Sequence, residues 1–131
     1  MADRTRPAFP AATVLIVAAG SGLGAVARHA VEMAFADQLA SLTLINLTGS
    51  LALGLLVGLT GSALRAPGQV VRRLYLLLGP GFLGGYTTFS TLMVAVVVDG
   101  SLSWAIMLGL QLLAGVLLAL LGVRIGQTVR S

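Results

Sequence analysis

The chain has 131 residues, of which 57% are hydrophobic and only 9% are charged. Soluble domains carry about 25% charged residues, so these few charges could not cover an ordinary soluble surface. The absence of cysteine excludes disulfides, thiolate catalysis and cysteine-ligated metal sites. The basic residues are dispersed among apolar stretches, which argues against a nucleic-acid partner. The composition therefore predicts an integral membrane protein.

Four uncharged stretches are long enough to cross a bilayer as helices, which requires about 20 residues each. The uncharged stretches are residues 7–27, 38–64, 74–98 and 100–123, and the spans predicted from them cover about residues 8–31, 40–64, 71–98 and 101–125. Turn-like residues separate the stretches, at 37–38, 65–68 and 99–101. The sequence thus predicts an all-α membrane protein in which residues 1–131 form a single domain of four transmembrane helices.

The arginines are distributed unevenly between the two sides predicted for this topology. One side receives Arg4, Arg6, Arg65, Arg72, Arg73, Arg124 and Arg130. The other side receives Arg28, with Glu32, Asp37 and Asp99. The positive-inside rule therefore predicts a multi-pass plasma-membrane protein with both termini in the cytoplasm. A cleavable signal peptide is a minor alternative, because the first apolar run continues to Ala27 and three further spans follow.

The first span contains a motif that imitates a dinucleotide-binding fingerprint. Gly20, Gly22 and Ala25 have the G-x-G-x-x-A spacing of that motif. The fingerprint also requires a second strand that ends in an acidic residue about 20 positions later, whereas another uncharged span follows here. Close helix packing along Gly20, Gly24 and Arg28 is the better interpretation, so the enzyme hypothesis is disfavoured.

Spans two and four each carry an amide on a stripe of small residues. The i+4 series are Asn46, Ser50, Gly54, Gly58 and Ser62 in span two, and Gln111, Gly115 and Ala119 in span four. Small residues at this spacing typically form a packing seam between helices. An amide in hydrocarbon either joins helices by a hydrogen bond or lines a polar path, and the sequence leaves both roles open for Asn46 and Gln111. No span has a central carboxylate, which argues against a proton-coupled exporter.

The third span is unusually rich in residues that disfavour a continuous helix. Gly79, Pro80, Gly81, Gly84 and Gly85 fall within seven residues, which predicts a helix broken in mid-membrane. Carbonyl oxygens freed at such a break are suitable ligands for Na⁺. The hydroxyls that follow, in the run TTFST at 87–91, can donate to an anion or satisfy the loosened backbone.

The run GPGFLGGYTTFSTL resembles the signature of the CrcB/Fluc fluoride channels, G-F-x-G-G-x-T-T-F-S-T-F. GLGAVAR in span one and INLTGSLALG in span two are similar to further motifs of that family. The resemblance implies an antiparallel dimer with fluoride pores at its interface and a structural Na⁺ at its centre. It also implies passive export of fluoride, which reduces fluoride toxicity in the cytoplasm, and no enzymatic activity.

The resemblance also implies roles for individual residues. The backbone carbonyls of Gly84 and Thr87 would bind Na⁺, and Arg28 would lie near the pore vestibule or a packing site. The predicted pore and fluoride-binding residues are Asn46, Phe89, Ser90, Thr91 and Gln111. Their amides, hydroxyls and ring edge supply weak positive ends without a full charge.

Four positions depart from the family pattern. Leu92 replaces a second pore aromatic, Ala95 a glutamate, Met107 a pore tyrosine and Gln111 a serine. The threonine before Asn46 is displaced as well, in the run SLTLIN. Because the arginines favour one orientation, an antiparallel dimer would need a homologous CrcB-like subunit of opposite orientation, so the hypothesis is one half of a heterodimeric channel. A homodimer, a non-conducting scaffold subunit and a small four-span exporter of another solute are the alternatives.

Overall fold

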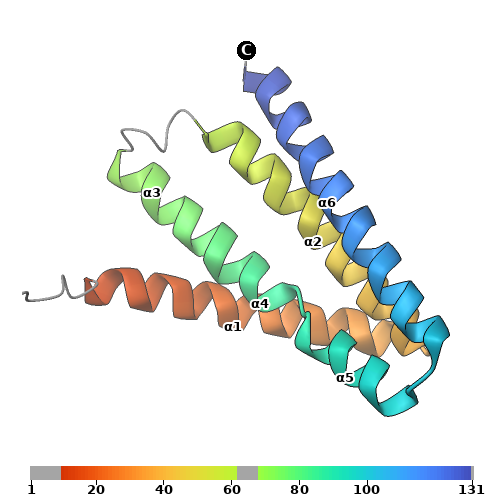
Figure 1. Cartoon of the computed structure of the whole chain (residues 1–131). Helices are drawn as coiled ribbons and strands as arrows, with labels where there is room; N and C mark the ends of the chain where they lie inside the picture. Colours follow the sequence, from red (N-terminus) through yellow and green to blue (C-terminus); the bar gives the residue numbers. More distant parts are fainter. Residues whose placement is uncertain (1–9, 62–67, 131) are drawn as a thin grey trace, which may run out of the picture.

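The computed structural model describes residues 10–61 and 68–130, and these residues form helices joined by short connections (Figure 1). The helices are α1 (Ala11–Ala34), α2 (Gln38–Thr60), α3 (Gln69–Leu76), the π-helix η1 (Leu77–Leu83), α4 (Gly84–Tyr86), α5 (Ser90–Asp99) and α6 (Leu102–Arg130). The positions of Arg4, Arg6, Ser62 and Arg65, and the outer ends of the first two expected spans, lie outside the described residues.

Four helical stretches in the described residues are long and apolar enough to cross a membrane. They are α1, α2, the composite stretch Gln69–Asp99 and α6. This confirms the predicted all-helical class with four spans. The ends alternate as successive crossings require: the start of α3 and the end of α6 lie at one end, and the α5–α6 connection lies at the other (Figure 1).

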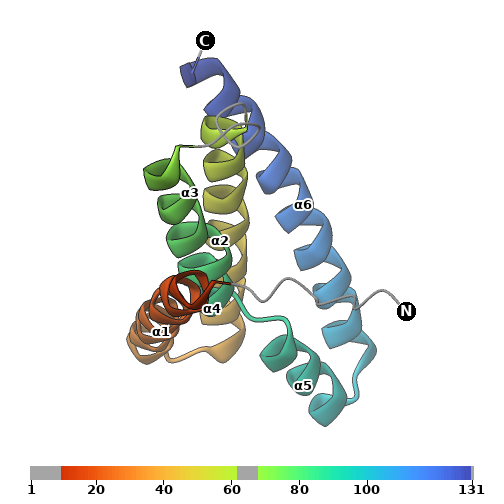
Figure 2. The same cartoon turned by 90° about the vertical axis from the view of Figure 1, so that its left-hand side faces the viewer.

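The helices pack as two main pairs. α2 packs along α6, whereas α1 crosses the chain and packs against η1 and α4. Figures 1 and 2 show α5 turned away from α4, so that it approaches the first half of α6. The third span therefore bridges the two pairs, with its first part on α1 and its last part on α6.

Small residues bring α2 and α6 into backbone contact. A Cβ atom at Gly54 would collide with the Ala119 carbonyl oxygen, and a Cβ at Gly58 would lie 3.0 Å from the Cα of Gly126. The stripe of small residues on span two therefore forms a packing seam, as in other membrane helix pairs.

The third span departs from a regular helix in two places. Gly79, Pro80 and Gly81 lie within η1, whose wider turn accommodates a proline that has no N–H to donate. The helix resumes as α4 and then ends, because Thr87 has extended backbone with φ −78° and ψ 153°. The expectation that the glycine-rich run itself opens the helix is therefore wrong: the interruption falls just after that run.

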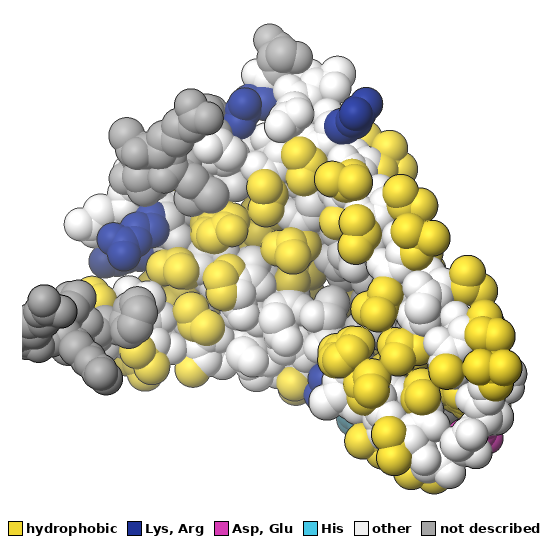
Figure 3. Space-filling model, viewed as in Figure 1, with side chains coloured by type: hydrophobic (Ala, Val, Ile, Leu, Met, Phe, Trp, Pro, Cys, Tyr) yellow, Lys and Arg dark blue, Asp and Glu magenta, His cyan; other side chains and the backbone are white. Residues whose placement is uncertain are grey.

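The charges of the described residues gather at opposite ends of the molecule. Figure 3 shows basic side chains where α3 begins and where α6 ends, and these are Arg72, Arg73, Arg124 and Arg130. Hydrophobic side chains cover α6 and α5 between the two ends, and many of them are exposed, such as Leu117 at 57%. A broad apolar surface between charged ends suits a chain surrounded by lipid or by other membrane helices.

Candidate functional site

A groove of about 560 Å³ runs between α2, α6 and the third span. Its lining includes five of the residues singled out from the sequence, namely Asn46, Gly84, Thr87, Phe89 and Gln111. Thr88 and Leu92 line it as well. Most of the remaining lining is aliphatic or glycine, so the few polar groups are set in an apolar wall.

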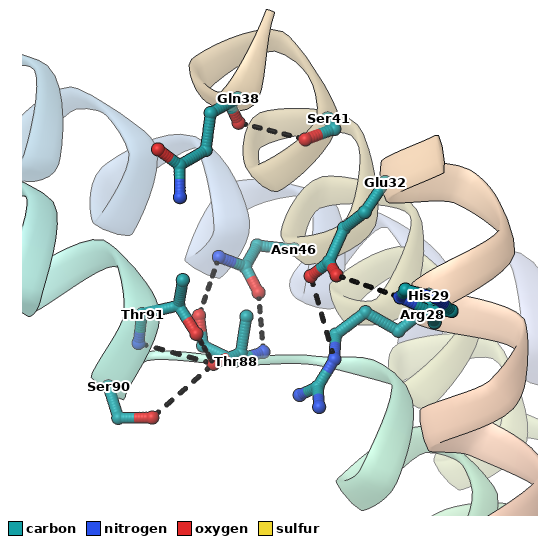
Figure 4. A network of polar contacts seen from close by, with 9 residues as sticks. All are labelled: Arg28, His29, Glu32, Gln38, Ser41, Asn46, Thr88, Ser90 and Thr91. Carbon is teal, nitrogen blue, oxygen red and sulfur yellow. Dashed lines mark hydrogen bonds and ion pairs between the residues drawn. The ribbon is translucent and has the colours of Figure 1, made fainter. Parts of the chain in front are cut away.

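The Asn46 amide closes the gap that the helix interruption leaves in the backbone hydrogen bonds. Its Nδ2 donates to the Thr88 carbonyl oxygen at 3.0 Å, and its Oδ1 accepts from the Thr88 backbone N–H at 2.9 Å (Figure 4). Thr88 is 7% exposed, so without this amide its backbone groups would be buried and unpaired. The sequence left two roles open for Asn46, a hydrogen bond between helices and the lining of a polar path. The observed bonds are of the first kind, because they join α2 to the third span, and the second N–H of Nδ2 remains for a ligand.

A small hydroxyl cluster surrounds the start of α5. The Thr88 hydroxyl oxygen lies 2.9 Å from the Thr91 hydroxyl oxygen and 3.4 Å from that of Ser90. It also accepts a hydrogen bond from the Thr91 backbone N–H at 3.3 Å, as a helix-capping threonine does (Figure 4). Ser90 and Thr91 therefore contact Thr88, which lines the groove, but do not line the groove themselves.

Three residues around the interruption, Gly84, Thr87 and Phe89, line the groove. The Phe89 side chain is 56% exposed and sits where α5 begins. Among the described residues, no N–H donates to the carbonyl oxygens of Gly84 or Thr87. The backbone N–H groups that follow them in the chain bond elsewhere: that of Thr87 to the Leu83 carbonyl oxygen, that of Thr88 to Asn46, and that of Thr91 to the Thr88 hydroxyl. Two unpaired carbonyl oxygens at one helix end are available as hard oxygen ligands.

The Gln111 side chain is 7% exposed and holds α6 to α2. Its Nε2 donates to the Thr43 hydroxyl, and its Oε1 is buried with no hydrogen-bond partner among the described residues. Thr43, the displaced threonine of span two, is therefore the hydrogen-bond partner of Gln111, which stands where the family pattern has a serine. Of the two roles left open for Gln111, the observed bond is a helix-to-helix contact, and the same side chain also lines the groove.

Arg28 lies outside the groove lining. Its Nε is 3.7 Å from Glu32 Oε1, one helical turn further along α1 (Figure 4). His29 Nδ1 lies 3.9 Å from the other oxygen of the same carboxylate. Both Arg28 and Glu32 side chains are about one-third exposed, at 30% and 34%, so this pairing is a solvent-screened contact rather than a buried ion pair.

The positions that depart from the family pattern differ in their surroundings. Leu92 is 2% exposed and packs inside the chain, whereas Met107 on α6 is 39% exposed. Ala95 is half-buried on α5. Leu92 is therefore part of the chain's own small core, together with Leu42 and Ile45.

Two residues of the site were not among the predicted site residues. Thr88, which anchors Asn46 and caps α5, belongs to the hydroxyl run, and its position before Ser90 and Thr91 could have marked it as a cap. Thr43 is the displaced threonine of span two, and nothing local in the sequence connects it with Gln111, 68 positions away.

Four helices able to span a membrane, with an apolar groove that contains a few uncharged polar groups, define a multi-pass membrane protein. A family model described as CrcB-like protein, Camphor Resistance (CrcB), matches residues 15–126. The chain belongs to this family, and the resemblance carried by its three motifs is confirmed.

Curated relatives of the chain carry names of one kind. It is 40% identical over 94 residues to Fluoride-specific ion channel FluC 1 of Corynebacterium jeikeium, covering 63% of this chain and 67% of that protein. It is 43% identical over 83 residues to Fluoride-specific ion channel FluC 1 of Nitrobacter hamburgensis, covering 60% and 63%. A third relative, Fluoride-specific ion channel FluC of Methylobacterium nodulans, is 44% identical over 81 residues, covering 59% and 62%. The matches thus span about two thirds of these relatives' lengths or slightly less.

Proposed function

We infer that this protein is a subunit of a fluoride-specific ion channel that lets fluoride leave the cytoplasm passively. The observation that carries this inference is the groove, which places the Asn46 amide, the Phe89 ring and the Gln111 amide in one apolar wall. Family membership and the names of three relatives support the same ion. Passive efflux through such a subunit lowers cytoplasmic fluoride and so reduces its toxicity.

The chemistry of the groove suits a small anion that gives up tightly held water. A neutral amide N–H and the positive edge of an aromatic ring attract an anion, and neither holds it as strongly as a full positive charge would. The described residues that line the groove include no Asp, Glu, Lys or Arg. Fluoride can therefore find replacement donors there and still move on, which conduction requires. Ser90 and Thr91 support this path through the Thr88 hydroxyl.

A structural Na⁺ fits the carbonyl groups next to the helix interruption. Gly84 and Thr87 line the groove, and their carbonyl oxygens receive no N–H from the described residues. A bound Na⁺ would supply the positive partner that these oxygens lack. In this proposal the interruption lies at mid-membrane depth, and the ion joins the two subunits of a dimer.

The partner in that dimer is a homologous CrcB-like subunit of opposite orientation. The described arginines away from Arg28 gather at one end of the molecule, which favours a single insertion orientation with both termini in the cytoplasm. A chain that inserts in one orientation cannot supply both halves of an antiparallel dimer. The partner would also contribute aromatic residues, because Leu92 brings an aliphatic side chain to the groove where the family pattern has a second aromatic.

Fluoride efflux from liposomes tests this function. We expect efflux when the chain is reconstituted with an oppositely oriented homologue from the same genome, and little or none when the chain is alone. Equal efflux by the chain alone would reject the heterodimer. Efflux by the partner alone, unchanged when this chain is added, would instead assign it a non-conducting scaffold role. Transport of chloride or a cationic solute in place of fluoride would reject the fluoride channel.

Replacing Phe89 should impair transport and leave folding intact. The ring is 56% exposed, so Phe89→Ile removes little packing but removes the ring edge from the groove. We expect fluoride efflux to fall by about tenfold or more, which corresponds to a barrier raised by about 1.4 kcal/mol. Phe35→Ile is the matched control, because Phe35 is 42% exposed at the end of α1 and does not line the groove. Equal efflux in the two variants would remove Phe89 from the pathway.

A further inference from the structure

The two amides of the groove differ in the kind of partner that holds them. Asn46 donates to a backbone carbonyl oxygen and accepts from a backbone N–H, both of Thr88. A carbonyl oxygen only accepts and a backbone N–H only donates, so the Asn46 amide has one orientation. Gln111 is held by the Thr43 hydroxyl, and a hydroxyl can accept or donate. The Gln111 amide can therefore keep its hydrogen bond to Thr43 in two orientations.

These two orientations leave opposite groups unpaired. With Nε2 bonded to Thr43, the buried Oε1 has no donor among the described residues. In the inverted orientation the Thr43 hydroxyl donates to Oε1, and Nε2 presents two N–H groups in its place. Each unpaired buried group is unfavourable unless a ligand satisfies it. In the inverted orientation both N–H groups of Nε2 are free for an anion, which is the strongest type of acceptor for an N–H, and Oε1 gains a donor.

Gln111, whose amide has these two possible orientations, is one of the residues that line the groove. The side chain is 93% buried (7% exposed) and lines the groove together with Asn46 and Phe89. Its stem extends from α6, and its partner Thr43 lies one helical turn before Asn46 on α2. Gln111 is thus a second amide-bearing residue of the groove lining besides Asn46, and its amide orientation is not fixed by the backbone.

We propose that Thr43 and Gln111 form an amide switch that inverts when a fluoride ion binds beside Gln111. Without the ion, Nε2 donates to the Thr43 hydroxyl; with the ion, the Thr43 hydroxyl donates to Oε1 and Nε2 donates to fluoride. When the ion leaves, Thr43 again accepts from Nε2, so the ion is exchanged for a protein partner rather than trapped. Thr43 is the positioning residue of this pair, and Gln111 contacts the ion. This inference rests on the proposed function, because it assigns fluoride as the ligand.

Nuclear magnetic resonance of the glutamine side-chain amides tests the switch. The chain contains four glutamines, Gln38, Gln69, Gln111 and Gln127, which can be labelled selectively with nitrogen-15 in the full-length protein in lipid nanodiscs. Gln111→Met identifies the Gln111 resonances. We expect the Gln111 NH₂ resonances to shift in a saturable manner with sodium fluoride, to stay in place with sodium chloride, and to differ from the three other glutamines in this response.

Two variants of Thr43 separate the switch from a packing role. Thr43→Ser keeps a hydroxyl and should retain both the fluoride-dependent shift and the efflux. Thr43→Val keeps the size but removes the hydroxyl, so the shift should disappear and efflux should fall by about tenfold, as expected for loss of the hydrogen bond that positions the Gln111 amide.

The outcomes distinguish the switch from the proposed function. If the unaltered protein shows fluoride efflux but no fluoride-dependent shift at Gln111, the switch is overturned and the channel function stands. If Gln111 responds to fluoride but no reconstitution gives efflux, the anion site stands and the channel function fails. Identical responses in Thr43→Val and the unaltered protein would overturn the role of Thr43. A Thr43→Val chain that does not fold leaves the test to the titration of the unaltered protein, which decides it without a variant.

Discussion

Asn46→Leu should both destabilise the protein and abolish its fluoride efflux. Leucine cannot replace the two hydrogen bonds to Thr88, and the Thr88 backbone N–H and carbonyl would be left unpaired in a residue that is 7% exposed. Each unpaired buried group costs about 1–3 kcal/mol. The free energy of unfolding in mixed micelles should therefore fall by more than a single lost side-chain contact would cause, and liposome efflux should fall to the background rate.

The neighbouring Thr48 provides a matched control on the same helix. Its hydroxyl donates to the Leu44 carbonyl oxygen of its own helix and lies 3.2 Å from the Tyr86 hydroxyl, and its side chain is exposed. Thr48→Val should change the free energy of unfolding by no more than about 0.5 kcal/mol, as surface substitutions usually do. If Asn46→Leu is as stable and as active as Thr48→Val, the amide does not close the helix interruption in the membrane.

The class and the number of spans could be predicted from the sequence because they depend on local composition. A stretch of about 20 apolar residues is long enough to cross a bilayer whatever its neighbours are, so hydropathy predicted four spans, and the described residues contain four helices able to span a membrane. The family motif likewise singled out Phe89 and Asn46, and the structure places both in one groove. These features are local in the chain, or belong to a motif that is read as a unit.

The details of the site depend on contacts between distant residues and could not be predicted in the same way. The position of the interruption is an example: Pro80 and its neighbouring glycines remain helical in η1, and the helix ends only where Asn46, 42 residues before Thr88, supplies alternative hydrogen bonds. Local propensity predicted a break but not the partner that stabilises it. The Thr43–Gln111 bond, across 68 residues, is a second contact of this kind.

Gly24→Val should disrupt the contact between α1 and the third span and so displace the site. A Cβ at Gly24 would collide with the Phe82 carbonyl oxygen and lie 2.8 Å from the Tyr86 backbone nitrogen. These obstacles are backbone atoms, which cannot move aside as a flexible side chain can, so the helices must separate. Overpacking a core costs about 1–3 kcal/mol, and a backbone collision belongs at the upper end of that range. The free energy of unfolding should fall accordingly.

The effect should extend to transport because Tyr86 is the last residue of α4, directly before the interruption. A shift of α4 moves Thr87 and Thr88 away from Asn46, and efflux should fall together with stability. Gly22→Val supplies the control, since it makes the same substitution two residues earlier in α1, where a Cβ meets no atom within 4 Å. That variant should stay within about 0.5 kcal/mol of the unaltered protein. Comparable losses in both variants would point to a general intolerance of valine in α1, whereas a loss confined to Gly24→Val would assign the support of the site to its contact with α4.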